Sequence, residues 1–198
     1  ALTTTGHDHI TIKGSVMQHT VLMGTSATGN VLEITGRRVT VENITIDGNA
    51  TRIAGSSGHG LYADNDPSGA GFTQGHLVLR DVLVTHQPQD GLHIVDPELH
   101  FWQNIDSVSN GRYGINIVFD DIQPWNSTFI NVRSITNVDQ GLFCTQGHYL
   151  TFIALQCYSN GGTCQASFIG GRDLVLINPD IENIPQKDNQ AGNNIGII

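Results

Sequence analysis

The sequence predicts an all-β protein built as a parallel β-helix, a solenoid of about seven coils. Three observations predict it: a repeat near 23 residues, apolar and polar residues that alternate within each copy, and many Asn and Gly residues. A repeat of roughly 20–50 residues is typical of solenoids and propellers. Alternation is typical of strands with one buried face, so helical repeats are disfavoured.

Each copy of the repeat starts with Asn or a polar or small substitute, followed by an aliphatic residue. The fullest copy is Asn104–Gly114, in which a second Asn, Asn110, precedes Gly114. Stacked coils place equivalent residues above one another, so we expect these Asn side chains to hydrogen-bond to the backbone and to each other. The leading positions, at intervals of 38, 23, 27, 23 and 24 residues, are Asn43, Asp81, Asn104, Asn131, Ala154 and Asn178.

Three short strands are expected before the regular repeat, at 9–13, 20–23 and 31–35, separated by turn residues. From Val39 onward, apolar columns predict the core. Trp102 shares one of them with Phe129 and Phe152 and is expected inside. The column that follows each Gly position contains Leu61, Leu92, Ile115, Leu142 and Ala166.

The chain length of 198 residues suits one β-helix domain, with N-terminal coils in 1–38 and regular coils in 39–198. We expect it to be a fragment of a longer chain, with its open ends covered by missing sequence or by a homotrimer. The three cysteines show no metal-ligand spacing and are expected to be mostly buried thiols, with a Cys157–Cys164 disulfide as the alternative.

The charge of the chain argues against some classes of binding partner. The net charge is −9, with only 9 Lys and Arg residues spread thinly, which argues against nucleic acid and anionic membranes. No apolar run is long enough to insert into a membrane. A polar surface such as a glycan is the compatible partner.

The segment Ile34–Asn49, with Val39-Thr40-Val41-Glu42-Asn43-Ile44 at its centre, resembles the first full coil of right-handed, single-stranded parallel β-helix proteins of the pectate-lyase-like superfamily. The resemblance extends over nearly the whole chain. It implies a long, shallow polysaccharide-binding face, often in a trimeric phage tail spike, and hence an extracellular or virion location. Fold alone does not fix function, so the site is argued from its residues.

Insertions locate a candidate site at one corner of the coils. The segments after Leu61 and Ile115 are longer than the others, and stacking places both at the same corner. Carboxylates gather there on three successive coils: Asp64, Asp66, Asp96, Glu98, Asp120 and Asp121. Paired carboxylates suit glycoside hydrolysis, and we assign catalysis to Asp96, Glu98, Asp120 and Asp121. The alternative is a solvated turn edge; no cofactor is expected unless these oxygens bind Ca²⁺.

A column of side chains next to the acids is expected to point outward, because each follows an inward aliphatic residue by one. Aromatic and amide groups there suit a sugar's apolar face and hydroxyls, although a neighbouring subunit could equally cover them. His93 is the candidate proton carrier beside Asp96. The substrate-binding residues are Tyr62, Asn116, Phe143, Trp125, Asp64 and Asp66, and the outward column also contains Ser167.

Three functions remain open from the sequence. The first is a polysaccharide hydrolase or lyase; a lyase would draw on Arg80, Arg133 or His93 as proton abstractor, but neither arginine lies in a pectate-lyase motif. The second is a non-catalytic β-helix for adhesion or structural assembly. The third is a sugar epimerase on the same fold, with Tyr62 and His93 as its acid and base.

Overall fold

The computed structural model describes residues 2–4, 9–25, 28–49, 57–64, 75–119, 126–171, 173–182 and 195–197. Within these ranges the chain forms β-strands and no helix, and every strand pairing is parallel. The strands stack as a β-solenoid of about six turns over these ranges, which confirms the predicted fold class. No helix in the described part of the chain could span a membrane.

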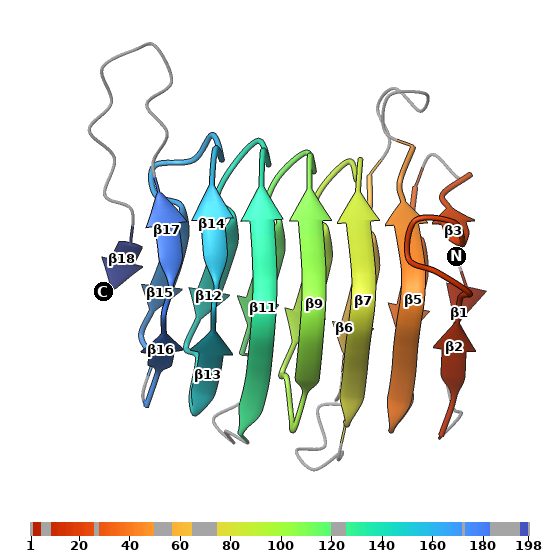
Figure 1. Ribbon diagram of the computed structural model, residues 1–198, viewed down its shortest axis with the longest axis horizontal. Helices are drawn as coiled ribbons and strands as arrows, with labels where there is room; N and C mark the ends of the chain where they lie inside the picture. Colours follow the sequence, from red (N-terminus) through yellow and green to blue (C-terminus); the bar gives the residue numbers. More distant parts are fainter. Residues whose placement is uncertain are drawn as a thin grey trace.

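Two parallel sheets run along the long axis of the molecule, with the chain ends at opposite extremes (Figure 1). The first sheet takes one short strand from each coil, in the order β1 (Leu2–Thr3), β4 (Leu32–Ile34), β6 (Leu61–Asp64), β8 (Leu92–Val95), β10 (Ile115–Val118), β12 (Leu142–Thr145), β15 (Ala166–Ile169) and β18 (Ile195–Ile197).

The second sheet contains the longer strands and lies in front of the first in Figure 1. Its main path runs through β2 (Thr11–Lys13), β5 (Val39–Asp47), β7 (Leu77–Thr85), β9 (Phe101–Val108), β11 (Ser127–Ile135), β13 (Leu150–Ile153) and β16 (Val175–Ile177). Three further strands extend it: β3 (Val21–Met23) on β5, β14 (Gln156–Tyr158) on β11, and β17 (Asp180–Glu182) on β14.

The leading Asn of each repeat marks a bend inside the long strands. Asn43, Asn104 and Asn131 have φ of 56°, 55° and 53°, in the left-handed region that Asn tolerates better than most residues. Asn131 Nδ2 donates to Asn104 Oδ1 at 2.8 Å, and Asn104 Nδ2 donates to Asp81 Oδ1 at 2.8 Å. Ala154 takes the same backbone shape with φ 55° but has no amide to continue the ladder, and there the strand is divided into β13 and β14.

A second amide ladder is buried at the turn that leads back to the first sheet. Asn137 Nδ2 donates to Asn160 Oδ1 at 2.8 Å, and Asn110 Nδ2 donates to Asn137 Oδ1 at 2.9 Å. The same oxygens accept the backbone N–H groups of Asn110 and Asn137, both at 3.0 Å. Gln87 and Gln165 extend the ladder at its two ends. These contacts confirm the predicted role of the recurring Asn residues.

The core lies between the sheets and is built from the predicted apolar columns. Trp102 is completely buried and meets the Phe129 ring edge-on at 4.7 Å between centroids, while Phe129 stacks on Phe152 at 4.5 Å. Cys144 and Cys157 are buried free thiols and Cys164 is a half-buried one, so the thiol prediction is confirmed and no disulfide links Cys157 to Cys164.

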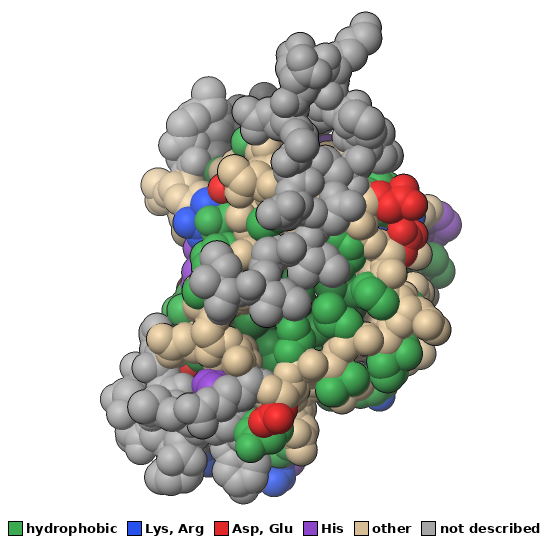
Figure 2. All heavy atoms as spheres, turned by 90° about the vertical axis from the view of Figure 1, so that its left-hand side faces the viewer, with side chains coloured by type: hydrophobic (Ala, Val, Ile, Leu, Met, Phe, Trp, Pro, Cys, Tyr) green, Lys and Arg blue, Asp and Glu red, His purple; other side chains and the backbone are tan. Residues whose placement is uncertain are grey.

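The described strands at both ends leave apolar side chains exposed. Val21 and Met23 are exposed near the N-terminal end, and Val175 and Ile177 near the C-terminal end. Figure 2 faces the C-terminal end and shows hydrophobic side chains there. Such edges are usually covered in solenoid proteins.

Replacing Asn137 by Ala should lower the free energy of unfolding by about 2–4 kcal/mol, because it leaves several buried backbone and amide groups of the ladder without partners. Urea unfolding followed by circular dichroism measures this change. The control is Val138→Ala at the neighbouring exposed side chain, which we expect to change stability by less than about 0.5 kcal/mol. Equal effects of the two variants would contradict the role of the ladder.

His100 should make the folded protein less stable in acid. Burial lowers the pKa of His100 from 6.5 to about 3, so between these values the unfolded chain binds a proton that the folded chain does not. The free energy of unfolding should therefore fall as pH drops through this window, by at most about 1.4 kcal/mol per pH unit from this residue. Urea unfolding at a series of pH values should show a flatter dependence for His100→Gln. Exposed His19, changed to Gln, is the control; a wild-type slope in His100→Gln would refute the assignment.

Candidate functional site

The described carboxylates of the acidic corner predicted from the insertions lie at the ends of two adjacent strands of the first sheet, β6 and β8. Asp64 at the end of β6 is in register with Val95 of β8, which is in register with Val118 of β10. Asp96 follows Val95 directly with φ 48°, and its backbone N–H donates to the Val118 carbonyl at 2.8 Å. The described side chains of Asp64 and Asp96 are half-buried. Asp66, Asp120, Asp121 and Trp125 lie outside the described residues.

Glu98 lies at the same corner and differs from an ordinary surface carboxylate. Burial raises the pKa of Glu98, opposed by a hydrogen bond from the Gly75 backbone N–H at 3.4 Å and by the nearby His76 and Arg37. A carboxyl group whose pKa is raised keeps its proton to higher pH and can act as a general acid. Burial therefore shifts the pKa of Glu98 in the direction that a general acid requires.

The predicted outward column exists in register across the first sheet: Tyr62 pairs with His93, His93 with Asn116, Asn116 with Phe143, and Phe143 with Ser167. Its exposure differs from the expectation. Asn116 and Ser167 are only 4% and 5% exposed. For Asn116 the reason is its contact with Asp90, which lies in the turn before β8, and with the neighbouring His93.

Two members of this column, Tyr62 and Phe143, make stacking contacts with other rings. The Tyr113 ring lies face to face with Phe143, with centroids 4.8 Å apart and planes 9° apart. Tyr62 stacks on His93 at 5.5 Å, and its hydroxyl donates to Asp64 Oδ2 at 3.2 Å. Phe143 is therefore half-buried against its own chain. The Tyr62 hydroxyl links the column to the acidic corner.

The centre of the column is organised by Asp90, a fully buried carboxylate in the turn before β8. Arg112 donates two hydrogen bonds to this carboxylate, from Nε to Oδ1 at 2.5 Å and from Nη2 to Oδ2. His93 Nδ1 lies 2.8 Å from Asp90 Oδ2, and Asn116 Nδ2 donates to the same oxygen at 3.0 Å. His59 Nδ1 lies 3.3 Å from it. Asp90 thus joins residues of three coils.

The electrostatics of this cluster follow from burial and pairing. Burial disfavours the charged form of Asp90, but hydrogen bonds from His93, Arg112 and Asn116 outweigh it and hold the pKa of Asp90 below its usual range. Burial also lowers the pKa of His59 to about 4, against the attraction of Asp90. At neutral pH the cluster therefore holds an ionised Asp90, a charged Arg112 and a neutral His59.

The repeat pattern does not predict a role for Asp90, His59, Arg112 or Tyr113, although one feature of the sequence is shared by three of them. His59, Asp90 and Tyr113 each directly precede the Gly of a repeat, so they occupy one stacked position. The repeat skeleton was built from Asn, Gly and aliphatic residues, and this position varies in residue type. The carboxylate in contact with His93 is thus Asp90, where the sequence suggested Asp96.

The arginines proposed as proton abstractors are engaged on the second sheet. Arg133 donates from Nε and Nη2 to Asp106 at 2.9 and 2.7 Å, and these bonds raise the pKa of Arg133. Arg80 lies over the Phe101 ring at 5.7 Å. A raised pKa disfavours Arg133 as a base. A hollow of about 230 Å³ beside Arg133 is lined by Met17, Asn104, Asp106, Asn131, Arg133 and Gln156.

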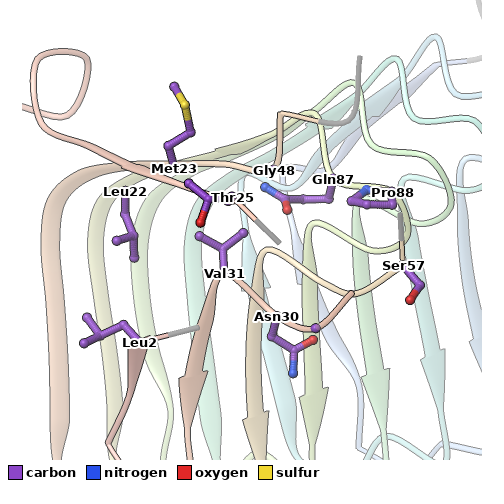
Figure 3. Close-up of a pocket in the computed structure, with 12 residues that line it drawn as sticks. Leu2, Leu22, Met23, Thr25, Asn30, Val31, Gly48, Ser57, Gln87 and Pro88 are labelled. Carbon is purple, nitrogen blue, oxygen red and sulfur yellow. The ribbon is translucent and has the colours of Figure 1, made fainter. Parts of the chain in front are cut away.

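Another hollow, of about 180 Å³, lies near the N-terminal end of the solenoid. Figure 3 shows Leu22, Met23 and Val31 on one side of it and Ser57, Gln87 and Pro88 on the other. None of the described residues that line it is charged.

Comparison with solved structures finds two phage tailspike chains. Full-length tailspike protein 2 of the Escherichia coli O157:H7 bacteriophage CAB120 matches with a TM-score of 0.61 and 15% identity, over 82% of this chain and 24% of that chain. The enzymatically active domain of tailspike protein 2 from bacteriophage CBA120 matches with a TM-score of 0.48 and 13% identity, over 90% of this chain and 37% of that chain. No protein-family model and no curated protein matches the sequence.

The first likeness establishes the fold: the chain is a parallel β-helix of the tailspike type. The chain spans about a quarter of the length of the tailspike that it matches. Fold similarity at this level of identity carries no catalytic residue from one chain to the other.

Arg112→Met should destabilise the protein by about 3 kcal/mol, because it leaves a fully buried carboxylate without its main counter-charge. Arg133→Met is a matched control: both arginine side chains are 40% exposed, but Asp106 is 22% exposed whereas Asp90 is completely buried. The control should cost less than about 1 kcal/mol. Urea unfolding of both variants tests the difference, and similar losses would show that burial of Asp90 is unimportant.

Proposed function

We propose that the protein is a polysaccharide-binding and polysaccharide-hydrolysing module of a tailspike-like protein. The observation that carries the proposal is the position of the acidic corner beside the outward column, on a fold of the tailspike type. A homotrimer and a virion or extracellular location belong to the same proposal. Chain contacts at the exposed ends would then cover the open strand edges.

The proposed chemistry uses Glu98 as general acid and Asp96 as the second carboxylate. Glycosidases need one carboxyl that is protonated and one that is ionised, at about 5–9.5 Å separation. Burial of Glu98 supports the first role. Asp64 lies one coil away, about 4.8 Å per coil, and is the alternative partner. Asp120 and Asp121 remain candidate catalytic residues from the sequence. Asp66 and Trp125 remain candidate substrate-binding residues.

The proposed binding surface is the column itself. Tyr62 and Phe143 present ring surface that suits the apolar face of a sugar, and the partly exposed imidazole of His93 can bond its hydroxyls. The ordered stack of Tyr113 on Phe143 supports this role, because a rigid aromatic platform costs little entropy on binding.

A second candidate function is adhesion without catalysis. The observation that favours it is the left-handed backbone of Asp96, with φ 48°, which Asp tolerates better than most residues and which gives this carboxylate a structural purpose in its turn. In that case the acids serve as turn residues and the glycan is held but not cleaved.

A panel of bacterial capsular and plant acidic polysaccharides should separate these functions. Hydrolysis releases reducing ends, and elimination additionally gives an unsaturated product that absorbs in the ultraviolet. We expect reducing ends without that absorbance, and a loss of at least about 100-fold in rate for Glu98→Gln and for Asp96→Asn. The rate should fall as pH rises through the pKa of Glu98, since the acid must carry its proton.

Two variants complete this experiment. Asp180→Asn changes an exposed carboxylate on the second sheet and should leave the rate unchanged. Phe143→Ala should weaken binding about tenfold while leaving the carboxylates in place. Wild-type hydrolysis by both Glu98→Gln and Asp96→Asn would refute the catalytic assignment. Binding without any product would favour adhesion.

A further inference from the structure

The cluster around Asp90 contains three groups of the types that hold transition-metal ions. His59 Nδ1, His93 Nδ1 and an Asp90 oxygen all lie within 4.8 Å of one another. Asp90 Oδ2 is 2.8 Å from His93 Nδ1 and 3.3 Å from His59 Nδ1. Ligand atoms about 2.0–2.2 Å from a tetrahedral ion lie roughly 3.3–3.6 Å apart, so the His59–Asp90 distance fits a common ion and the His93–Asp90 distance would have to lengthen.

Asn116 provides a second, independent observation. Its side chain is 4% exposed, and its Oδ1 has no hydrogen-bond partner although it is buried. Its Nδ2 lies 3.0 Å from Asp90 Oδ2 and 3.1 Å from His93 Nδ1. The two ends of an amide have nearly the same shape, so turning the group over places the oxygen toward the cluster. In that orientation an ion would take the place of the donor that this oxygen lacks, while Nδ2 would move to the side on which Oδ1 now has no partner.

From these two observations we propose that His59, Asp90, His93 and Asn116 form a binding site for a divalent transition-metal ion of the Zn²⁺ class. Two imidazole nitrogens with one carboxylate oxygen favour Zn²⁺, Co²⁺ or Ni²⁺ over Ca²⁺, which prefers six or more oxygen ligands. The site is distinct from the carboxylates at the acidic corner, and the proposal does not depend on the hydrolytic function.

The surroundings of the site are suited to holding such ligands in place. Arg112 binds both oxygens of Asp90 and fixes the carboxylate, as outer groups commonly do at metal sites. The two imidazole rings come from neighbouring coils and lie 4.3 Å apart with planes at 32°. Each has its Nδ1 atom near Asp90 Oδ2. Because His59 precedes β6 and Asn116 belongs to β10, an ion bound here would join three successive coils of the solenoid.

The test is titration of the chelator-treated full chain with Zn²⁺ by calorimetry, and with Co²⁺ by visible absorption. We expect one Zn²⁺ per chain with a Kd below about 10 µM, and a Co²⁺ band typical of nitrogen and oxygen ligands. Ca²⁺ should bind at least tenfold more weakly. The melting temperature should rise with Zn²⁺ concentration, because a ligand that binds only the folded chain stabilises it.

Substitutions of the proposed ligands test which side chains bind the ion. His59→Gln and His93→Gln should each weaken Zn²⁺ binding at least tenfold, and both positions are partly exposed, so these variants should fold. The matched control is His86→Gln, which removes a histidine 3.4 Å from Asp47; it should bind Zn²⁺ as the wild type does. Asn116→Asp should bind more tightly if the oxygen faces the ion. Absence of Zn²⁺ binding by the wild type, or wild-type affinity in both histidine variants, would overturn the proposal.

Discussion

The in-register pairing of parallel strands is the constraint on which everything else in this structure depends. Each coil can pair with the next only if the chain turns at equivalent places, and those turns require the left-handed backbone found at Asn43, Asn104 and Asn131. Asn104 and Asn131 also join in an exposed ladder of amides, whereas a separate ladder through Asn137 and Asn160 satisfies buried polar groups of the turns. The repeated sequence is therefore a consequence of stacking as much as its cause.

Stacking also explains why a site can be assembled from short, separate segments. The acidic corner and the column of Tyr62, His93 and Phe143 come from strands that are far apart in sequence but adjacent in the sheet. The Asp90 cluster is more demanding, because one buried charge needs partners from three coils. Burial of a charge is unfavourable without such partners, which gives the cluster its fixed geometry.

The sequence predicted the fold well because the fold is periodic. Alternation and the apolar columns placed Trp102, Phe129 and Phe152 correctly in the core. It predicted the register of the outward column but not the burial of Asn116, because Asp90, which contacts it, comes from a turn position whose residue type does not repeat. Asp90 and Arg112 were missed for the same reason: their 22-residue separation gives a contact only once the turn is folded. Whether the corner acids catalyse anything depends on distances that periodicity alone does not encode.

Because Asp90 contacts residues of three successive coils, it limits how this solenoid can change length in evolution. Solenoids commonly change length by duplicating or losing whole repeats, since each repeat contacts only its neighbours. Elsewhere in this chain the ladders of identical amides would accept an inserted copy. Between His59 and Arg112 an extra coil would separate Asp90 from its partners and leave a buried charge uncompensated. That stretch should be inherited as one unit, while coils on either side remain free to be gained or lost.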